Sequence, residues 1–412
     1  MHNLRINATR LWDTLMETAR IGATPKGGIK RLTLTDDDRT VRDWFKAAAE
    51  TLGCTVTIDA VGNMFARRAG RDPGLAPVCM GSHLDTQPTG GKFDGALGVL
   101  GALEVMRTLH ESGYETNAPI EIINWSNEEG SRFAPAMLAS GVFAGVFTTD
   151  YAYARQDHDG KRFGDELDRI GYRGTEPAGG HRLGAMFELH IEQGPILEDD
   201  GKTIGVVTGV HGMRWYEITV RGQNAHTGAT PMRLRRNALL GAARVIDAID
   251  GIAQAHAPEA VATVGLIENR PNSRNVIPGE TFFTVDLRHP DDAVVDDMEA
   301  RMRALLPAIL EPLKLAFEEK RIWTAPAVRF DPELIRCVRL AAKRAGFATR
   351  DIVSGAGHDA AYIARVAPAT MIFVPCLGGI SHNEAESTTF DECAAGAQVL
   401  LNAVLEYDRG LG

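Results

Sequence analysis

The chain has 412 residues, of which 44% are hydrophobic and 24% are charged. Its 54 acidic residues outnumber its 44 lysines and arginines, so the formal net charge is −10. This composition is that of a folded globular protein and excludes disordered and collagen-like classes. The acidic balance also argues against nucleic-acid binding, which requires a basic surface. Because the chain is longer than a single hydrophobic core usually supports, we expect two domains.

Features of targeting, membrane insertion and disulfide bonding are not evident in the sequence. Residues 1–5 run into a polar, amphipathic stretch without an apolar signal core, and no apolar run is long enough to span a bilayer. The cysteines form no CxxC pair, which predicts buried, reduced thiols. They are Cys54, Cys79, Cys337, Cys376 and Cys393. We therefore expect a cytoplasmic protein that binds no membrane.

The first half of the chain alternates predicted helices and strands. Apolar residues at helical spacing predict a helix over residues 7–20, and Thr35 followed by three aspartates predicts the N-cap of a helix reaching residue 52. The remaining elements expected here are strands at 55–59, 63–67 and 78–82, a helix at 94–109, and strands at 120–125 and 187–191. This alternation predicts an α/β sheet with helices on both faces.

The pattern changes near Gly212 and changes back near Asp331. Between them we expect strands at 215–220, 261–267 and 281–287, a helix at 236–255, and a helix at 293–315 broken by Pro307. After Asp331 the α/β pattern resumes, with helices through residue 344 and after His358, a strand at 370–374 and a closing helix to residue 405. The simplest organisation is one α/β domain, residues 1–210 and 328–412, interrupted by an inserted α+β domain, residues 211–327.

A histidine and two aspartates follow the predicted strand at 78–82. His83 could bind a metal ion, with Asp85 orienting its ring, and Asp94 opens the next helix. Strand ends and helix starts of α/β proteins point at one place outside the sheet. On its own, the His-x-Asp pattern is better explained by a histidine–aspartate pair that caps a turn.

Two adjacent acids, Glu128 and Glu129, follow the strand at 120–125. Burying both without a cation costs several kcal/mol, so one can bind a metal while the other moves protons. The alternative is a solvated acidic loop in which Arg132 neutralises one charge.

His190 and His382 are the remaining ligand candidates, and both lie at strand ends. Together with His83, Asp94 and Glu129 they form a set of nitrogen and oxygen ligands without thiolate. Such a set suits a pair of divalent ions, with Zn²⁺ favoured and Mn²⁺ or Co²⁺ as alternatives. A shared carboxylate holding two ions is a standard arrangement for hydrolysis.

These motifs together resemble the M20 family of metallopeptidases and amidohydrolases, and within it the hydantoinase/carbamoylase subfamily. The resemblance runs in order across nearly the whole chain. The matching segments are residues 81–86, 91–95, 127–133, 190–195, 225–232 and 381–384. The resemblance implies that the α/β domain is catalytic and binds the metals, and that the inserted domain is a lid through which a homodimer forms. A small ureido or carbamoyl carboxylate is then the expected partner.

The resemblance also implies residue roles at the metals. Asp94 would be shared by both ions, His83 and His190 would complete one site, and Glu129 and His382 would complete the other. Glu128 would be the general base that returns its proton to the leaving nitrogen.

Further residues would bind the substrate. His226 would polarise the scissile carbonyl, although a loop histidine that caps the next helix has the same pattern. Asn275 and Arg288 would bind the carboxylate, although Arg288 could simply pair with Asp286. Gln193 would also bind the substrate, although it could be a surface turn residue before Pro195. The weaker candidates for substrate binding are Arg214, His211 and Gly357, where His358 and Asp359 could equally cap a helix.

The favoured reaction is hydrolysis of an N-carbamoyl-L-amino acid to the amino acid, CO₂ and ammonia. Allantoate and N-carbamoyl-β-alanine are the alternative substrates, because each also pairs a carboxylate with a ureido group. An M20 dipeptidase or aminoacylase is disfavoured by the run from His190 to Gln193, and a non-catalytic metal-binding relative by the presence of Glu128.

Overall fold

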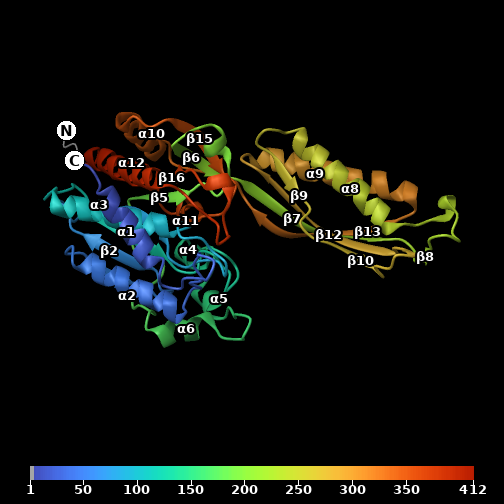
Figure 1. Ribbon diagram of the computed structural model, residues 1–412, viewed down its shortest axis with the longest axis horizontal. Helices are drawn as coiled ribbons and strands as arrows, with labels where there is room; N and C mark the ends of the chain where they lie inside the picture. Colours follow the sequence, from blue (N-terminus) through green and yellow to red (C-terminus); the bar gives the residue numbers. More distant parts are fainter. Residues whose placement is uncertain (1–3) are drawn as a thin grey trace. The chain divides into compact units, whose positions relative to one another are not determined.

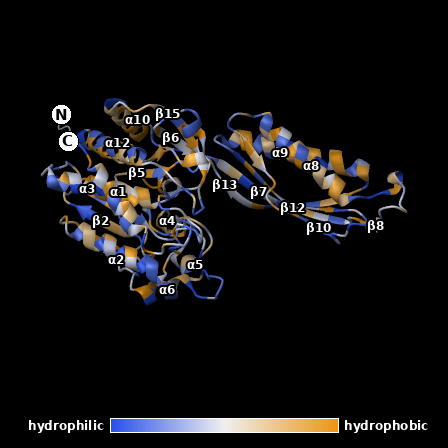
Figure 2. Ribbon diagram, viewed as in Figure 1, coloured by the Kyte–Doolittle hydropathy of each residue, from blue (hydrophilic) through white to orange (hydrophobic). Residues whose placement is uncertain are grey.

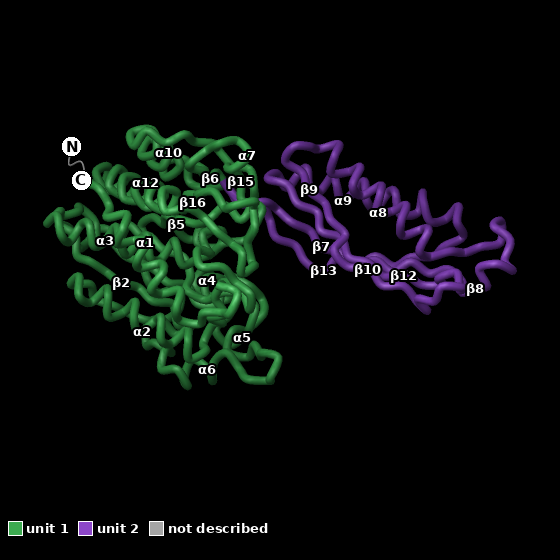
Figure 3. Tube along the Cα trace, viewed as in Figure 1, with its two compact units in different colours: residues 1–208, 329–412 green, residues 209–328 purple. Residues whose placement is uncertain are grey.

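The computed structural model describes residues 4–412, so residues 1–3 of the predicted signal-free start lie outside the described residues. The chain divides into two compact units (Figure 3). Unit 1 comprises residues 1–208 and 329–412, and unit 2 comprises residues 209–328. The sequence predicted these boundaries at 210/211 and 327/328.

Unit 1 is built on a mixed sheet that has nine strands in the described chain, with strand order β1-β2-β4-β3-β5-β16-β6-β14 and β15 paired to β6 (Figure 1). The strands are β1 (Thr55–Ile58), β2 (Met64–Arg68), β3 (Val78–His83), β4 (Ile120–Trp125), β5 (Ala185–Ile191), β6 (Ile204–Val210), β14 (Val328–Arg329), β15 (Thr349–Ser354) and β16 (Ala369–Val374). The four neighbouring strands β4, β3, β5 and β16 are parallel. Their carboxyl ends therefore meet at one edge of the sheet.

Helices cover this sheet, which confirms the predicted α/β class. They are α1 (Ala8–Thr18), α2 (Asp36–Glu50), α3 (Ala96–Glu111), α4 (Leu138–Phe143), α5 (Thr149–Tyr153), α6 (Phe163–Ile170), α7 (Ile196–Asp199), α10 (Pro332–Ala345), α11 (Asp359–Ile363) and α12 (Phe390–Arg409). The Thr35 side chain caps α2 by accepting the Asp38 N–H, as the sequence predicted. Helix α3 is buried on nearly all sides, so each of its leucines contributes roughly 1.5–3 kcal/mol to stability.

Successive side chains of β5 point to opposite faces of the sheet, so core residues lie on one face and candidate site residues on the other. Leu189 points at glycines of α3 and α12, which lie on one face of the sheet. Glu188 and His190 point to the opposite face, where the Ala360 N–H of α11 donates to Glu188. Figure 2 shows apolar and polar residues mixed along the helices, and the buried apolar ones include Leu11 and Leu15 of α1 and Val41 and Phe45 of α2.

Unit 2 is a five-stranded antiparallel sheet packed against two long helices. Its strands are β7 (Gly212–Arg221), β9 (Val261–Thr263), β10 (Ile267–Arg270), β12 (Glu280–His289) and β13 (Ala316–Ala325), with a separate pair β8 (Ala225–His226) and β11 (Val276–Ile277). Helices α8 (Ala238–Gln254) and α9 (Asp292–Leu310) pack on β7 and β12. The core side chains of unit 2, including Tyr216, Phe283 and Met302, come from the strands and both helices.

Three local predictions in unit 2 were wrong. Helix α9 is not broken at Pro307, because Leu306 and Leu310 beside it are buried in the core and hold the last turn helical. The helix ends at residue 310, a short 3-10 helix follows at Glu311–Leu313, and residues 316–325 form β13, a polar strand that the sequence pattern did not reveal. The strand expected at 261–267 is two short strands, β9 and β10.

The cysteine prediction is confirmed, since all five are buried and none forms a disulfide in the described chain. Among the described residues, no helix combines the length and apolarity that crossing a membrane requires.

Candidate metal centre

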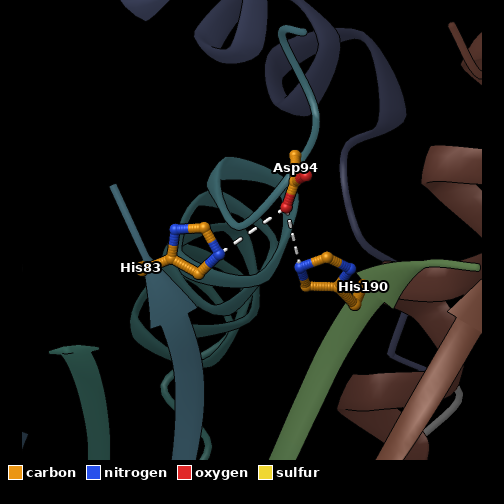
Figure 4. Close-up of side chains that lie close together, drawn as sticks. All are labelled: His83, Asp94 and His190. Atoms are coloured by element: carbon orange, nitrogen blue, oxygen red, sulfur yellow. Dashed lines mark ion pairs between the residues drawn. The ribbon is translucent and has the colours of Figure 1, made fainter. Parts of the chain in front are cut away.

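Two histidines and an aspartate meet at the carboxyl edge of the parallel strands. His83 ends β3, His190 lies near the end of β5, and Asp94 lies on the loop before α3 (Figure 4). The Asp94 Oδ1 atom is 3.6 Å from His83 Nε2 and 3.2 Å from His190 Nε2. All three side chains are buried. We call them the first ligand group.

Main-chain carbonyls fix both imidazoles of this group. His83 Nδ1 lies 2.9 Å from the Asp85 carbonyl, and His190 Nδ1 lies 2.9 Å from the Ile191 carbonyl. Because a carbonyl only accepts, each Nδ1 donates its proton there, which leaves Nε2 as the ring atom that faces Asp94 and is available to a metal ion. This is the tautomer that a metal-binding histidine needs.

The role expected of the Asp85 side chain needs correction. Its main-chain carbonyl, rather than its carboxylate, orients the His83 ring, because the turn after β3 brings that carbonyl beneath Nδ1. The carboxylate instead accepts the N–H groups of Glu128 and Glu129, at 3.3 and 3.4 Å. Burial and the charge of Asp38 raise the pKa of Asp85 to about 7.

A second ligand group uses the other oxygen of Asp94. His382 Nε2 lies 3.5 Å from Asp94 Oδ2 and 3.4 Å from Glu129 Oε2. Glu129 follows β4, and His382 follows β16. Asp94 thus faces both groups, one with each carboxylate oxygen. His382 is 52% exposed in its side chain, so the second group is open to solvent.

Glu128 lies beside both groups. Its Oε2 is 3.5 Å from His83 Nε2, and the side chain is buried. The preceding residue, Asn127, has a positive φ of 58°, and its amide donates to the Phe133 carbonyl at 2.7 Å, which fixes the turn that presents the two acids. Burial, together with the charges of Asp359 and Glu129, raises the pKa of Glu128 well above its ordinary value.

The charges at this edge fit divalent cations. Asp94, Glu128 and Glu129 are buried together, and none is paired with lysine or arginine within residues 4–412. Burial and the charges of Asp94 and Asp85 raise the pKa of Glu129, as expected for acids that lack a cationic partner. A donor set of imidazole nitrogens and carboxylate oxygens suits Zn²⁺, Mn²⁺ or Co²⁺.

Gly95 shapes the first ligand group, and its replacement by alanine should weaken metal binding by about 10–100-fold. Gly95 has a φ of +64°, and an added Cβ would lie 2.3 Å from His83 Cε1, so the ring must move from Asp94. Gly113→Ala is the matched control, because Gly113 has a φ of +63° and open space around it. Titration with Zn²⁺ measures both variants. Equal affinities in the two would contradict the prediction.

Unit 2 brings His226 and Asn275 together. His226 pairs with Val276 across the two strands β8 and β11, and the Thr227 N–H donates to the Asn275 carbonyl at 3.2 Å. His226 Nδ1 accepts the N–H groups of Gly228 and Ala229, so the ring closes its own turn and does not cap the next helix. The exposed ring keeps Nε2 as its protonated nitrogen, able to donate a hydrogen bond.

The two arginine candidates lie on opposite faces of the unit 2 sheet. The Arg288 guanidinium forms a bidentate ion pair with Asp286, with Nη2 2.6 Å from Oδ2, on the face of the sheet opposite the helices. Arg214 is buried on the helix-covered face, where Nη2 is 3.0 Å from Asp296 and Nε is 3.8 Å from Glu299. The Arg214 guanidinium already pairs with acids of α9, which argues against a contact with the substrate.

His211 lies close to Arg288, and its environment predicts a pH-dependent stability. Burial, then the charges of Arg288 and His289, lower the pKa of His211 to about 4. The folded-state pKa is below the ordinary 6.5, so the unfolded chain takes up the proton first and stability falls as the pH drops from 6.5 toward 4.

His211→Gln should reduce this loss, by on the order of 1 kcal/mol at about pH 5. Urea unfolding of the wild type and the variant at about pH 7.5 and about pH 5 measures the difference. The same pH dependence in both proteins would show that His211 is protonated equally in the folded and unfolded chains.

Gln193 and Gly357 lie in unit 1. Gln193 has a φ of 60°, and its Nε2 donates to Asp94 Oδ2 at 2.9 Å. Its Oε1 is buried and has no hydrogen-bond partner among the described residues. Gly357 packs against Met137, whose Cε would be 2.9 Å from an added Cβ. His358, one residue later, does not cap α11 with its side chain and instead packs its ring against His190.

Several residues that hydrogen-bond to the candidate metal ligands, or to the strands that carry them, were not predicted from the sequence. Glu188 accepts the Ser82 hydroxyl at 2.7 Å, and Gln87 donates to Glu129 at 2.6 Å. Glu386 accepts the Asp94 N–H at 3.0 Å. Strand alternation placed Glu188 on the side of His190 and was the available signal. No local pattern pairs Glu386 with a loop nearly 300 residues earlier.

The α/β fold of unit 1 and its two ligand groups are those of a metal-dependent hydrolase. The chain belongs to Peptidase family M20/M25/M40, whose profile matches residues 79–406. It is 54% identical over 404 residues to an N-carbamoyl-L-amino-acid amidohydrolase of Rhizobium meliloti, covering 98% of this chain and 97% of that protein. An allantoate amidohydrolase of Escherichia coli (strain K12) is 33% identical over 393 residues, covering 94% and 95%.

A solved structure agrees with this assignment. The crystal structure of an amidase of the hydantoinase/carbamoylase family from Burkholderia multivorans is 58% identical and covers 98% of both chains, with a TM-score of 0.96. The predicted resemblance to the M20 family and its hydantoinase/carbamoylase branch is confirmed.

Proposed function

We propose that this protein hydrolyses an N-carbamoyl-L-amino acid to the amino acid, CO₂ and ammonia. The observation that supports it most directly is the full-length similarity, at 54% identity, to a protein of that name. The described residues supply what the reaction needs, since Glu128 lies beside two ligand groups that share Asp94.

We assign His83, His190 and Asp94 to one divalent ion and Asp94, Glu129 and His382 to another. Such ions supply Lewis acidity and lower the pKa of water. Glu128 accepts a proton from the attacking water and delivers it to the leaving nitrogen. Burial and the neighbouring acids raise the pKa of Glu128 above its ordinary value, which makes its carboxylate a stronger base.

Gln193 supports recognition of a ureido group. Its Nε2 is held by Asp94, so the orientation of the amide is fixed and the buried Oε1 remains an acceptor. A ureido N–H can satisfy this acceptor, whereas the methyl group of an acetyl substrate cannot. Leaving a buried acceptor unsatisfied costs about 1–3 kcal/mol, which favours the ureido substrate.

We further propose that unit 2 is a lid and dimerisation domain. His226 would stabilise the carbonyl oxygen, and Asn275 and Arg288, with His211 nearby, would bind the carboxylate. Gly357 would offer main-chain groups to the substrate. Light scattering tests the dimer, and a monomer at micromolar concentration would defeat it. Allantoate is the second candidate substrate, because the chain is also similar over nearly its full length to allantoate amidohydrolases.

One substrate panel tests the proposed function. The protein, reloaded with Zn²⁺, Mn²⁺ or Co²⁺, is incubated with N-carbamoyl-L-amino acids, allantoate, N-carbamoyl-β-alanine, N-acetyl amino acids and dipeptides. We expect ammonia and free amino acid from the N-carbamoyl-L-amino acids, with the highest kcat/KM. Faster release from allantoate would select the second candidate, and exclusive cleavage of dipeptides would overturn both.

A further inference from the structure

A buried carboxylate outside the two ligand groups holds the loop that presents Asp94. Glu386 is 5% exposed and lies between β16 and α12. Its Oε1 accepts the N–H of Phe93 at 3.1 Å and the N–H of Asp94 at 3.0 Å. Charge-assisted hydrogen bonds of this kind are stronger than neutral ones, so the main chain at Asp94 is fixed from outside its own loop.

Ser381 connects the same carboxylate to the Asp94 side chain. Its Oγ lies 3.2 Å from Glu386 Oε2 and 3.0 Å from Asp94 Oδ2. Ser381 also directly precedes the ligand His382. Glu386 is therefore in contact, directly or through one hydroxyl, with two of the segments that supply the second ligand group.

The surrounding chain is shaped to accommodate Glu386. Gly91 packs so closely that an added Cβ would lie 2.1 Å from Glu386 Oε1. A buried carboxylate in a space that a glycine leaves open, with its oxygens on two main-chain N–H groups and a serine hydroxyl, has a use other than packing.

We propose that Glu386 is a positioning residue that fixes the Asp94 carboxylate between the two ligand groups. It holds the Asp94 main chain directly, through the N–H groups of Phe93 and Asp94, and it holds Ser381, which directly precedes the ligand His382. The Ser381 hydroxyl has one proton, and it donates this proton to Glu386 when Asp94 Oδ2 serves as a ligand. Asp94 then presents Oδ1 to the first group and Oδ2 to the second without reorganising. The inference rests on the proposed role of these groups as metal ligands.

The test measures metal affinity in the absence of substrate. Glu386→Gln, Ser381→Ala and Glu384→Gln are made in the full chain, stripped of metal and titrated with Zn²⁺ by calorimetry. Glu384 is the matched control, because it lies in the same loop and pairs at the surface with Lys26, 3.8 Å away. We expect Glu386→Gln to weaken Zn²⁺ binding by about 10–100-fold, the usual effect of removing a partner behind a ligand. Ser381→Ala should weaken it less, and Glu384→Gln should match the wild type.

Two further readouts separate positioning from a structural role. Thermal unfolding of the metal-free proteins reports the fold, and kcat and KM report the loaded enzyme. Positioning predicts a lower kcat with little change in KM. A Glu386→Gln protein that melts early but binds Zn²⁺ with wild-type affinity would overturn the proposal.

If Glu386→Gln does not fold, Ser381→Ala decides, and wild-type affinity in that variant overturns the proposal as well. A wild-type protein that hydrolyses no N-carbamoyl amino acid would defeat the proposed function but leaves the Zn²⁺ titrations valid. The two proposals therefore fail separately.

Discussion

Replacing Glu128 by glutamine should lower kcat by about 10²–10⁴-fold, the range typical of losing a general acid–base group, while metal binding stays at the wild-type level. The side chain lies 3.5 Å from His83 Nε2 but belongs to neither ligand group. Glutamine preserves its shape and removes its ability to accept and return a proton. Metal analysis and steady-state kinetics on the same preparation check the prediction.

The neighbouring acid gives the matched control. Glu129→Gln changes the same chemical group one residue later, but Glu129 Oε2 lies 3.4 Å from His382 Nε2 in the second ligand group. This variant should lose metal as well as activity. Near-normal turnover in Glu128→Gln, or loss of metal from both variants alike, would remove Glu128 from the role of base.

Replacing Asp94 by asparagine should weaken metal binding at both groups at once and abolish turnover. Each oxygen of the Asp94 carboxylate faces a different group, and an amide offers one neutral oxygen in place of two charged ones. We expect a larger loss of affinity than the about 10–100-fold typical of residues behind the ligands. Metal content after dialysis and kcat with excess Zn²⁺ are the measurements.

His382→Ala is the comparison for Asp94→Asn, because His382 belongs to the second group alone. It should lower metal content by one ion per chain, whereas Asp94→Asn lowers it at both positions. If the asparagine variant kept one ion as tightly as the wild type, Asp94 would not be shared.

The centre was the most predictable part of this protein. His83, Glu129, His190 and His382 each lie at the carboxyl end of a strand or in the loop after it, and parallel neighbouring strands bring these ends to one edge of the sheet. Their positions relative to the predicted strands were therefore enough to predict that these residues lie close together.

The sequence revealed less where long-range packing decides the outcome. Pro307 argues for a helix break locally, yet buried Leu306 and Leu310 override it. Arg214 and Arg288 look alike as carboxylate partners until the sheet register places them on opposite faces. The short helices α4, α5 and α6 have few turns each, so their apolar spacing is too brief to stand out.

Strand order has a consequence for how the protein matures. Strand β16, close to the end of the chain, lies between β5 and β6, which are synthesised much earlier. Until residue 374 has emerged from the ribosome, the facing edges of β5 and β6 have no partner, and such bare edges invite pairing with other chains. His382 emerges later still, so the second ligand group cannot form on the nascent chain. An ion held by the second group could bind only after His382 has emerged, and the facing edges of β5 and β6 stay open to pairing with other chains until β16 inserts.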